Sequence, residues 1–414
     1  MNTPPRPLDG KVVIDLTTAL SGPYATLLLA GLGARVIKVE NPGTGGDSSR
    51  NNSPYVTTNG LSVLRTGPSD MSVSMMLRGR NKQSMTLNMK NPASRQVFFD
   101  LVANADIVVE NYSAGVTKRL GIDYESVRHL NAALVYTSIS GFGAQGGHGT
   151  GKAMDTIIQA LSGVMMTAGK PDDPPIRFGL PVADLSAPLF AVIGTLAAVL
   201  HAERTGEGQH VDVSMLGALT SLVACEPFDA FEKIGLPMRT GDYVPRLAPF
   251  GTFASNDGWF AVCGPTDTFA YGVLRAIGQA ELASDERFAH RDGRVANAVE
   301  LHAMIAQWAQ HRSTAEVVCA LEAEGVPTAP VRSTADAVRD PLVLERREVV
   351  GLAHPQYGPV DDLYGAGVPI RMSATPPNLD EPAPGLGENT DEVLGGLLGY
   401  DQARIAELRA AGAL

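Results

Sequence analysis

A single carboxylate, Asp184, stands at the entrance to the most apolar stretch of the chain. Residues 189 to 200, which follow it, are almost entirely apolar and predict a buried helix. Burying a carboxylate is costly unless the group is paired or used in chemistry. Asp is also a preferred N-cap, and Pro188 is tolerated in or near a first helical turn. The local pattern favours a helix cap, and it leaves open a catalytic role.

Composition narrows the class of protein. The 414 residues suggest two domains or more. Lys and Arg total 33 against 44 Asp and Glu, and this net charge of −11 argues against nucleic-acid or anionic-membrane partners. Three dispersed cysteines fit a reducing cytoplasm. Residues 1 to 7 lack an apolar core, so we expect no signal peptide, and the run at 189 to 200 is too short to span a bilayer. The histidines form no ligand cluster, so we expect no metal.

The elements that would position Asp184 form a repeating pattern. Residues 11 to 16 predict a strand, 24 to 32 a helix that ends at Gly33, and 35 to 40 a second strand. A helix at 92 to 103 and strands at 107 to 110 and 134 to 139 continue the alternation. Such alternation is typical of a doubly wound α/β domain. Helical spacing of apolar residues also predicts a helix over 153 to 166.

The second half of the chain predicts a smaller α+β domain. Residues 250 to 253 and 259 to 263 predict a hairpin, and helices follow at about 266 to 279, 297 to 310 and 314 to 324. We expect a large domain over 1 to 205, a linker at 206 to 227, a small domain over 228 to 332, and a linker and return to the large domain at 333 to 414. Two helices, at 390 to 397 and 401 to 411, end the chain.

Two further patterns carry weaker signals. Gly141, Gly143 and Gly146 match a dinucleotide-binding spacing, but no helix opens directly after them, which argues against a dinucleotide site. Four dispersed cations admit two interpretations, either solvated surface charges or a site for a polyanionic ligand such as a phosphorylated nucleotide. Spacing alone favours the first interpretation for this set, which comprises Lys82, Lys90, Arg119 and Lys152.

Many blocks along the chain, in order, resemble the family III CoA-transferases, a group that includes formyl-CoA transferase, crotonobetainyl-CoA:carnitine CoA-transferase and α-methylacyl-CoA racemase. The resemblance covers essentially the whole chain. The blocks that carry it lie at residues 16–23, 32–40, 81–87, 105–112, 120–124, 140–143, 159–163, 204–215, 325–330 and 386–390.

The resemblance implies a fold, a partner and a mechanism. The fold would be a Rossmann-like large domain built from both chain ends plus a smaller domain, in a homodimer of interlocked rings. Asp184 would attack the thioester carbonyl of an acyl-CoA, and mixed-anhydride and aspartyl-CoA thioester intermediates would pass CoA to a carboxylic acid acceptor. No permanently bound cofactor is implied, since coenzyme A arrives as part of the substrate.

The resemblance also places the contacts with coenzyme A. They fall on Ala19, Leu20, Asn41, Leu87, Lys90, Asn111, Tyr112, Arg119, Leu120, Lys152, Met154 and Asp155. Two positions depart from formyl-CoA transferase, which has glutamine at the position of Leu20 and often arginine at that of Asn41. Formyl or oxalyl chemistry is therefore not favoured.

Two alternatives to CoA transfer remain open. A 2-methylacyl-CoA racemase or epimerase would need a histidine where this chain has Met154, and methionine cannot move a proton. A non-catalytic partner subunit of a CoA-transferase would have no need to retain Asp184.

If an arginine approaches the acyl group, a dicarboxylate substrate becomes attractive, because Arg binds carboxylates bidentately. The loop candidates are Arg65, Arg78, Arg80, Arg239 and Arg246.

Overall fold

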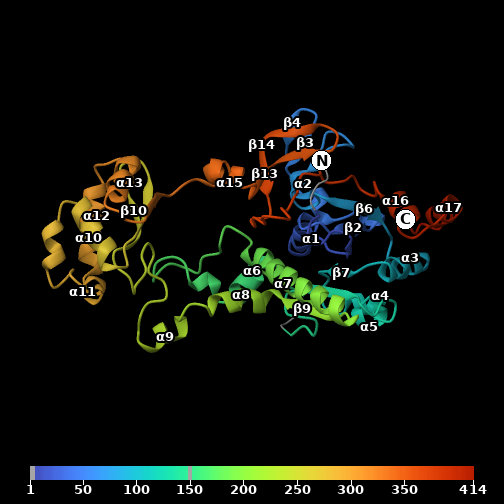
Figure 1. Cartoon of the computed structure of the whole chain (residues 1–414), viewed down its shortest axis with the longest axis horizontal. Coiled ribbons are helices and arrows are strands. Elements are labelled where there is room, and N and C mark those ends of the chain that lie inside the picture. Colours follow the sequence, from blue (N-terminus) through green and yellow to red (C-terminus); the bar gives the residue numbers. More distant parts are fainter. Residues whose placement is uncertain (1–4, 148–151) are drawn as a thin grey trace. The chain divides into compact units, whose positions relative to one another are not determined.

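The computed structural model describes residues 5–147 and 152–414, which group into two compact units (Figure 1). The first unit holds the described residues up to Ser162, together with Phe178–Leu222 and Val338–Leu414. The second holds Gly163–Arg177 and Val223–Ala337. This division differs from the expected one at its boundaries. Residues 206 to 222, expected as a linker, belong to the first unit. Residues 163 to 177, expected in the large domain, and the expected linker residues 223 to 227 and 333 to 337 belong to the second.

A six-stranded parallel sheet forms the centre of the first unit, which confirms the expected α/β class. Its order, β6-β2-β1-β7-β8-β9, is that of a doubly wound fold, in which ligands bind beyond the carboxyl ends of the strands where the order reverses. That reversal lies between β1 and β7. The strands are β1 (Val12–Asp15), β2 (Arg35–Glu40), β6 (Lys82–Thr86), β7 (Ile107–Glu110), β8 (Val135–Ser140) and β9 (His210–Ser214).

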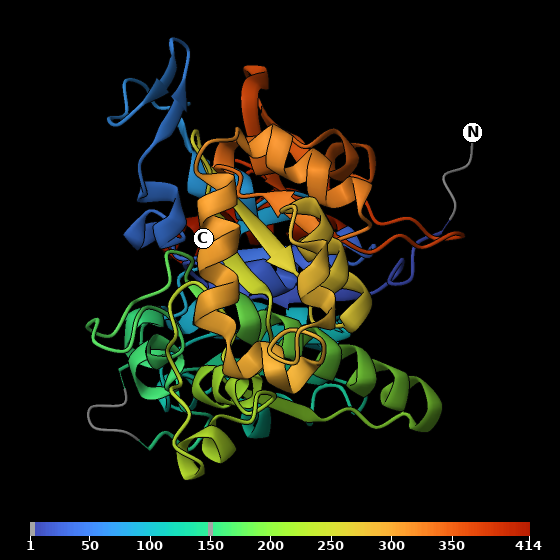
Figure 2. The same cartoon turned by 90° about the vertical axis from the view of Figure 1, so that its left-hand side faces the viewer.

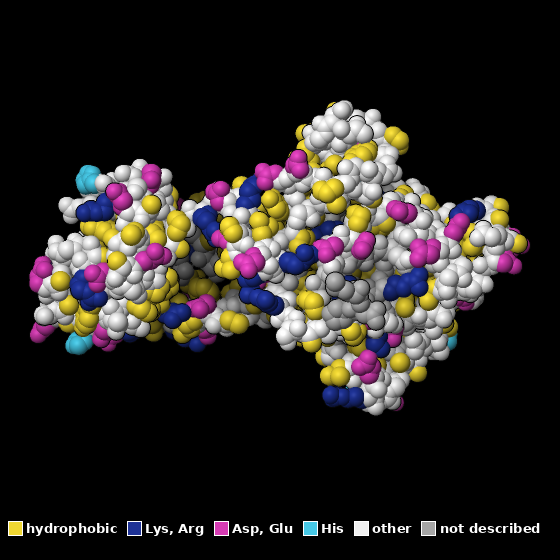
Figure 3. All heavy atoms as spheres, turned by 45° about the horizontal axis from the view of Figure 1, so that its top comes forward, with side chains coloured by type: hydrophobic (Ala, Val, Ile, Leu, Met, Phe, Trp, Pro, Cys, Tyr) yellow, Lys and Arg dark blue, Asp and Glu magenta, His cyan; other side chains and the backbone are white. Residues whose placement is uncertain are grey.

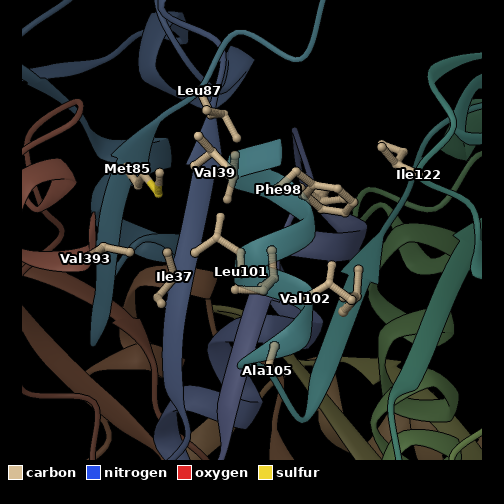
Figure 4. Packing of buried hydrophobic residues seen from close by; sticks show 14 of the residues in the cluster. Ile37, Val39, Met85, Leu87, Phe98, Leu101, Val102, Ala105, Ile122 and Val393 are labelled. Carbon is tan, nitrogen blue, oxygen red and sulfur yellow. The ribbon is translucent and has the colours of Figure 1, made fainter. Parts of the chain in front are cut away.

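One face of the sheet carries the main hydrophobic core. Side chains alternate between the faces along a strand, so Ile14 and Ile37 point to this face while Asp15 and Lys38 point to the other. Phe98 and Leu101 of α3 (Pro92–Ala103) pack against the strands, as Figure 4 shows. The terminal helices α16 (Thr390–Gly396) and α17 (Gln402–Ala410) cover the same face. Both had been predicted from sequence.

Two helices cover the opposite face, α1 (Ser21–Gly31) and α7 (Val182–Thr205). Thr195 of α7 hydrogen-bonds Thr137 of β8 at 2.6 Å, which ties the helix to the sheet. By length and composition alone α7 could cross a bilayer, so the expectation that its apolar run is too short was wrong; half of its apolar window is buried in this unit. Pro188 lies in the second turn, where its missing N–H leaves the Asp184 carbonyl without its usual helical donor.

Shorter elements complete the first unit. The helix expected over 153 to 166 is shorter and ends at Leu161. A small antiparallel sheet of order β4-β3-β5 and a hairpin of β13 and β14 lie outside the parallel sheet. These elements are α2 (Val73–Arg78), α4 (Val116–Leu120), α5 (Tyr124–Val127), α6 (Asp155–Leu161), α8 (Met215–Val223), α15 (Pro341–Glu345), β3 (Tyr55–Thr57), β4 (Gly60–Ser62), β5 (Met71–Ser72), β13 (Val349–His354) and β14 (Gly358–Ala366).

The second unit packs helices on a three-stranded antiparallel sheet of order β10-β11-β12 (Figure 2). The predicted hairpin is confirmed, with Phe253 opposite Phe260 in the core. Ser313 and Glu316 form a capping box at the start of α13. Its elements are β10 (Phe250–Ala254), β11 (Trp259–Cys263), β12 (Thr328–Pro330), α9 (Phe228–Lys233), α10 (Asp267–Ala276), α11 (Arg291–Ala296), α12 (Ala298–Ala309) and α13 (Thr314–Ala323), with α14 (Thr334–Val338) at the boundary.

Charged side chains of both signs are interspersed over the face shown in Figure 3. Lys and Arg do not gather there into one field, which agrees with the net charge of −11.

Candidate active site

Asp184 lies in the first turn of α7, half-buried, and its surroundings make it an unusual carboxylate. Burial raises its pKa to about 6, the charge of Asp155 adds to the rise, and the charge of Arg78 opposes it. Within the described residues, no hydrogen bond to its side chain offsets that rise. A carboxylate of this kind is more basic than a free one and still largely ionised at neutral pH.

Asp184 is not the cap of its helix, so that expectation was wrong. The helix begins at Val182, and the N-cap is Pro181, whose side chain cannot accept a hydrogen bond. Asp184 is therefore the third residue of the helix, where a negative charge interacts favourably with the helix dipole. The Ala183 N–H finds its acceptor on another element, the carboxylate of Asp155 at the start of α6, at 3.0 Å.

The loop between β1 and α1 is held from several sides. The Asn111 amide both accepts from the Thr18 N–H and donates to the Thr18 carbonyl, each at 2.9 Å. Asp47 accepts from the Ala19 N–H at 2.9 Å, and Arg78 donates to the Ala19 carbonyl at 3.1 Å. Ala19 itself has a φ of 68°, a left-handed conformation that is rare for a residue with a side chain. Four hydrogen bonds thus hold the loop at the reversal point of the sheet.

Buried charges lie beneath this loop. Lys38 bridges to Asp47 at 2.7 Å and donates to the Thr17 carbonyl at 2.7 Å. Lys82 contacts Asp15 at 3.0 Å. Burial opposes ionisation of Asp15, but the charges of the two lysines outweigh it and lower the pKa of Asp15 to about 2. Burial lowers the pKa of Lys82 to about 8.

A cavity of about 410 Å³ opens beside the loop, at the carboxyl ends of β1, β2, β6 and β7. Its walls combine apolar side chains, such as Val39 and Met89, with the phenol of Tyr112, whose pKa burial raises to about 12. The exposed cations Lys90 and Arg119 also line it. The cavity brings together six of the residues that the resemblance assigns to coenzyme A, namely Asn41, Leu87, Lys90, Tyr112, Arg119 and Leu120.

The other predicted contacts lie on nearby or separate elements. Asn111 clamps the β1–α1 loop, which carries Ala19 and Leu20. Lys152 and Met154 precede α6 and are exposed, whereas Asp155 is 7 % exposed and hydrogen-bonded inside the unit. Of the four dispersed cations considered as a polyanion site, Lys82 is buried against Asp15 and is not available to a ligand.

The five candidate arginines separate clearly. Arg78 is the one of these five whose charge acts on Asp184. Arg65 stacks over the Tyr55 ring, and Arg80 is buried and donates to the Ala366 carbonyl at 2.6 Å. Arg239 and Arg246 belong to the second unit and bind the Pro174 carbonyl and Glu226, respectively.

Several residues of this site were not singled out from sequence. Asp47 lies in a polar Gly- and Ser-rich stretch without a distinguishing pattern, and Asp15 and Lys38 were assigned only to strands. A charged residue inside an apolar strand was the available signal, because such residues are buried only when paired. Among the described residues, no group of three or more His, Cys, Asp or Glu side chains could hold a metal ion.

Comparison with known proteins assigns the family. The model of CoA-transferase family III matches residues 8–390, so the chain belongs to that family. Succinyl-CoA:mesaconate CoA-transferase of Haloarcula marismortui is 37% identical over 391 residues, 94% of this chain and 95% of that protein. Succinate–glutarate CoA-transferase of Agrobacterium fabrum is 34% identical over 388 residues, with the same coverage.

The fold agrees with this assignment. The crystal structure of a CaiB/BaiF family protein from Brucella suis matches with a TM-score of 0.81 and 32% sequence identity. The match covers 95% of this chain and 100% of that one. The family resemblance inferred from sequence is therefore confirmed, and these relatives support an acyl-CoA:carboxylate CoA-transferase.

Proposed function

We propose that this protein transfers CoA from an acyl-CoA thioester to a carboxylic acid, with Asp184 as the covalent nucleophile. The observation that carries the proposal is the state of Asp184, a half-buried carboxylate with a pKa raised to about 6 and no hydrogen bond that would lower it within the described chain. Raised basicity strengthens a carboxylate nucleophile, while a pKa below 7 keeps most of it ionised in neutral solution.

The bonds balance without any further reactant. A carboxylate oxygen of Asp184 attacks the thioester carbonyl, the C–S bond breaks, and CoA leaves as a thiolate, which gives a mixed anhydride. The thiolate then attacks the aspartyl carbonyl and releases the donor acid, so that Asp184 carries CoA as a thioester. The acceptor carboxylate attacks that thioester, and the returning thiolate attacks the acceptor's carbonyl, which forms the new acyl-CoA and regenerates Asp184.

The remaining residues supply binding and electrostatics. We assign the 410 Å³ cavity to the nucleotide end of CoA, with Lys90 and Arg119 placed to neutralise its phosphates. The fixed β1–α1 loop, with Ala19 and Leu20, would guide the pantetheine arm toward the thioester. The positive end of the α7 helix dipole would stabilise the oxyanion that develops during each attack.

The test is mass spectrometry of the protein mixed with acyl-CoA donors and an acid acceptor. We expect a CoA adduct on the peptide that contains Asp184, and none in Asp184→Ala. Turnover by Asp184→Ala would contradict the mechanism. Enzyme-dependent deuterium uptake from D₂O at the α-carbon of a 2-methylacyl-CoA would instead favour racemisation, which we disfavour because Met154 carries no titratable group.

We further propose that the acid is a dicarboxylate and that Arg78 binds its distal carboxylate. Arg78 uses one nitrogen on the Ala19 carbonyl, and its charge acts on Asp184. The relatives named above carry succinyl, mesaconate or glutarate in their names, and all of these are dicarboxylic acids or their acyl groups. A guanidinium suits such a group because its N–H donors match a carboxylate bidentately.

We propose, finally, that the active protein is a homodimer of interlocked chains, as the family resemblance implies. Exposed apolar side chains on and beside α6 and α7, two helices in contact, support a protein partner, because an interface would remove them from water. The set comprises Met154, Ile157, Leu161, Leu189, Phe190, Ile193 and Leu200.

A further inference from the structure

Asp155 is bound to the segment that leads into α7. Its Oδ1 accepts from the Ala183 N–H at 3.0 Å, and its Oδ2 accepts from the Gln159 amide at 2.7 Å. Gln159 is fully buried and reaches the same segment twice more: it accepts from the Phe178 N–H at 3.0 Å and donates to the Leu180 carbonyl at 3.2 Å. The two side chains of α6 therefore fix three backbone positions between 178 and 183.

These contacts supply a hydrogen-bond acceptor that the start of α7 would otherwise lack. The first N–H groups of a helix lack partners inside the helix, and an N-cap side chain normally accepts from one of them. Pro181 cannot do so. Asp155 takes over this role from another helix, and the amide that it holds belongs to Ala183, the residue directly before Asp184. Because Asp155 serves as the acceptor, the oxygens of Asp184 are not committed to the helix end.

The same arrangement places a second carboxylate near Asp184. The charge of Asp155 raises the pKa of Asp184 in addition to the effect of burial, while the charge of Arg78 acts in the opposite direction. Both groups come from outside α7, Asp155 from α6 and Arg78 from α2. The electrostatic effect agrees with the geometry.

We infer that Asp155 is a positioning residue for CoA transfer, which caps α7 from outside and leaves Asp184 free to attack, and that its side chain is not a CoA ligand. The inference rests on the proposed function of Asp184, and it reassigns a residue that the family resemblance placed among the CoA contacts. Asp155 has 7 % of its surface exposed, and both of its oxygens accept hydrogen bonds within the protein, so little of its side chain is accessible to a ligand.

The test compares Asp155→Ala and Asp155→Asn in the full-length protein. Two quantities separate positioning from binding: the rate of adduct formation on Asp184 at saturating acyl-CoA, and the Kd for free CoA measured by calorimetry. We expect Asp155→Ala to slow adduct formation by about 10–100-fold, as misplacement of a reacting group does, while the Kd changes less than about 2-fold. Asp155→Asn keeps an acceptor for Ala183, so it should recover most of the rate at pH 8.

The pH profile gives a readout that simple loss of structure would not move. In Asp155→Asn the acid limb of adduct formation should shift to lower pH, because the neighbouring negative charge is gone while Arg78 remains. Asp401→Ala is the matched control, since Asp401 caps α17 by accepting from the Arg404 N–H. It removes the same kind of cap, and the rate, the Kd and the acid limb should be unchanged.

Hydrogen exchange separates this inference from the proposed function. Peptides that contain residues 182 to 186 should exchange faster in Asp155→Ala than in wild type, and Asp401→Ala should not alter them. If wild type forms no adduct, the proposed function fails while the exchange result still tests the cap. Unchanged exchange in Asp155→Ala, or a Kd for CoA raised 10-fold with an unchanged adduct rate, would overturn the positioning role.

Discussion

At the scale of single residues, Asp184 combines two properties that rarely occur together, a place in the first turn of a helix and a raised pKa. A carboxylate near the start of a helix usually accepts hydrogen bonds from the helix N–H groups. These bonds lower its pKa and its nucleophilicity. Here Asp155 accepts from the first turn, and Asp184 has a pKa raised to about 6. Asp184 therefore interacts with the helix dipole without serving as the helix cap.

The pH dependence of the first chemical step follows from this pKa. Asp184 must be ionised to attack, so the rate of adduct formation should fall about tenfold per unit below a midpoint near pH 6 and be level above pH 7. Single-turnover kinetics between pH 4.5 and 8 would measure it, with a thermal melt at each pH as the control for unfolding. A midpoint near pH 4 would mean that burial and Asp155 do not act on Asp184.

The charge of Arg78 has a consequence for substrate choice. Arg78→Met should lower kcat/KM for succinyl-CoA or succinate by about 10–100-fold, the loss expected for one charge-assisted hydrogen-bonded contact, and should affect butyryl-CoA or butyrate much less. Arg65→Met is the matched control, because Arg65 stacks on Tyr55 and its charge does not appear among those acting on Asp184. Equal losses for the two acids would show that Arg78 acts only on Asp184 or the Ala19 loop.

At the scale of elements, the carboxyl ends of the strands combine a hydrophobic sheet with buried ion pairs. Asp15 and Lys82 have no exposed side-chain surface, and Lys38 and Asp47 have 1 % each. Replacing one partner leaves the other charge buried and unpaired. The resulting loss of folding free energy is larger than the stabilisation that the intact pair contributes. The network therefore restricts which substitutions are tolerated at the buried charged positions beneath the β1–α1 loop.

Asp15→Ala should destabilise the protein by about 3–5 kcal/mol, because it leaves Lys82 buried without its carboxylate. Glu407→Ala is a suitable comparison, since Glu407 pairs with the exposed Arg404 on α17 and the pair should contribute less than about 1 kcal/mol. Urea denaturation at pH 7 would measure both. Similar losses in the two variants would mean that water reaches the Asp15 site.

The helices and strands could largely be predicted from the sequence, but the side-chain contacts between them could not. Hydrophobic spacing and the glycine at position 33 predicted the first β-α-β unit, and the hairpin at 250 to 263 was also found. Lys82 was treated as a surface cation because nothing in its neighbourhood shows that Asp15, 67 residues away, pairs with it. The cap of α7 was assigned to Asp184 for the same reason, since its acceptor lies 28 residues earlier.

At the scale of the whole molecule, two units share one chain that leaves the first unit and returns to it. The first unit holds the parallel sheet, the cavity and Asp184. Leu189, Phe190 and Ile193 are exposed apolar residues of α7, the helix that carries Asp184 in its first turn. If a second chain covers them, assembly and chemistry depend on the same helix.

Light scattering should therefore give a molar mass of about twice the 43.5 kDa of one chain. Ile193→Glu should weaken the dimer, because it places a charge in an apolar contact, and the mass should fall toward that of a monomer on dilution. Val299→Glu, at a still more exposed position in the second unit, should have no effect. A wild-type protein with the mass of a monomer would contradict the proposed assembly.

The left-handed conformation of Ala19 has a consequence for the energetics of binding. An alanine at φ 68° is about 1–2 kcal/mol less favourable than in a right-handed conformation, a cost that glycine would avoid. Glycine, however, would also allow the loop many other conformations. With alanine clamped by Asp47, Arg78 and the neighbouring Asn111 contacts, the loop is already ordered before its ligand arrives. If the loop contacts coenzyme A as proposed, little conformational entropy is lost on binding, and the strain at Ala19 would be offset by tighter binding of the substrate.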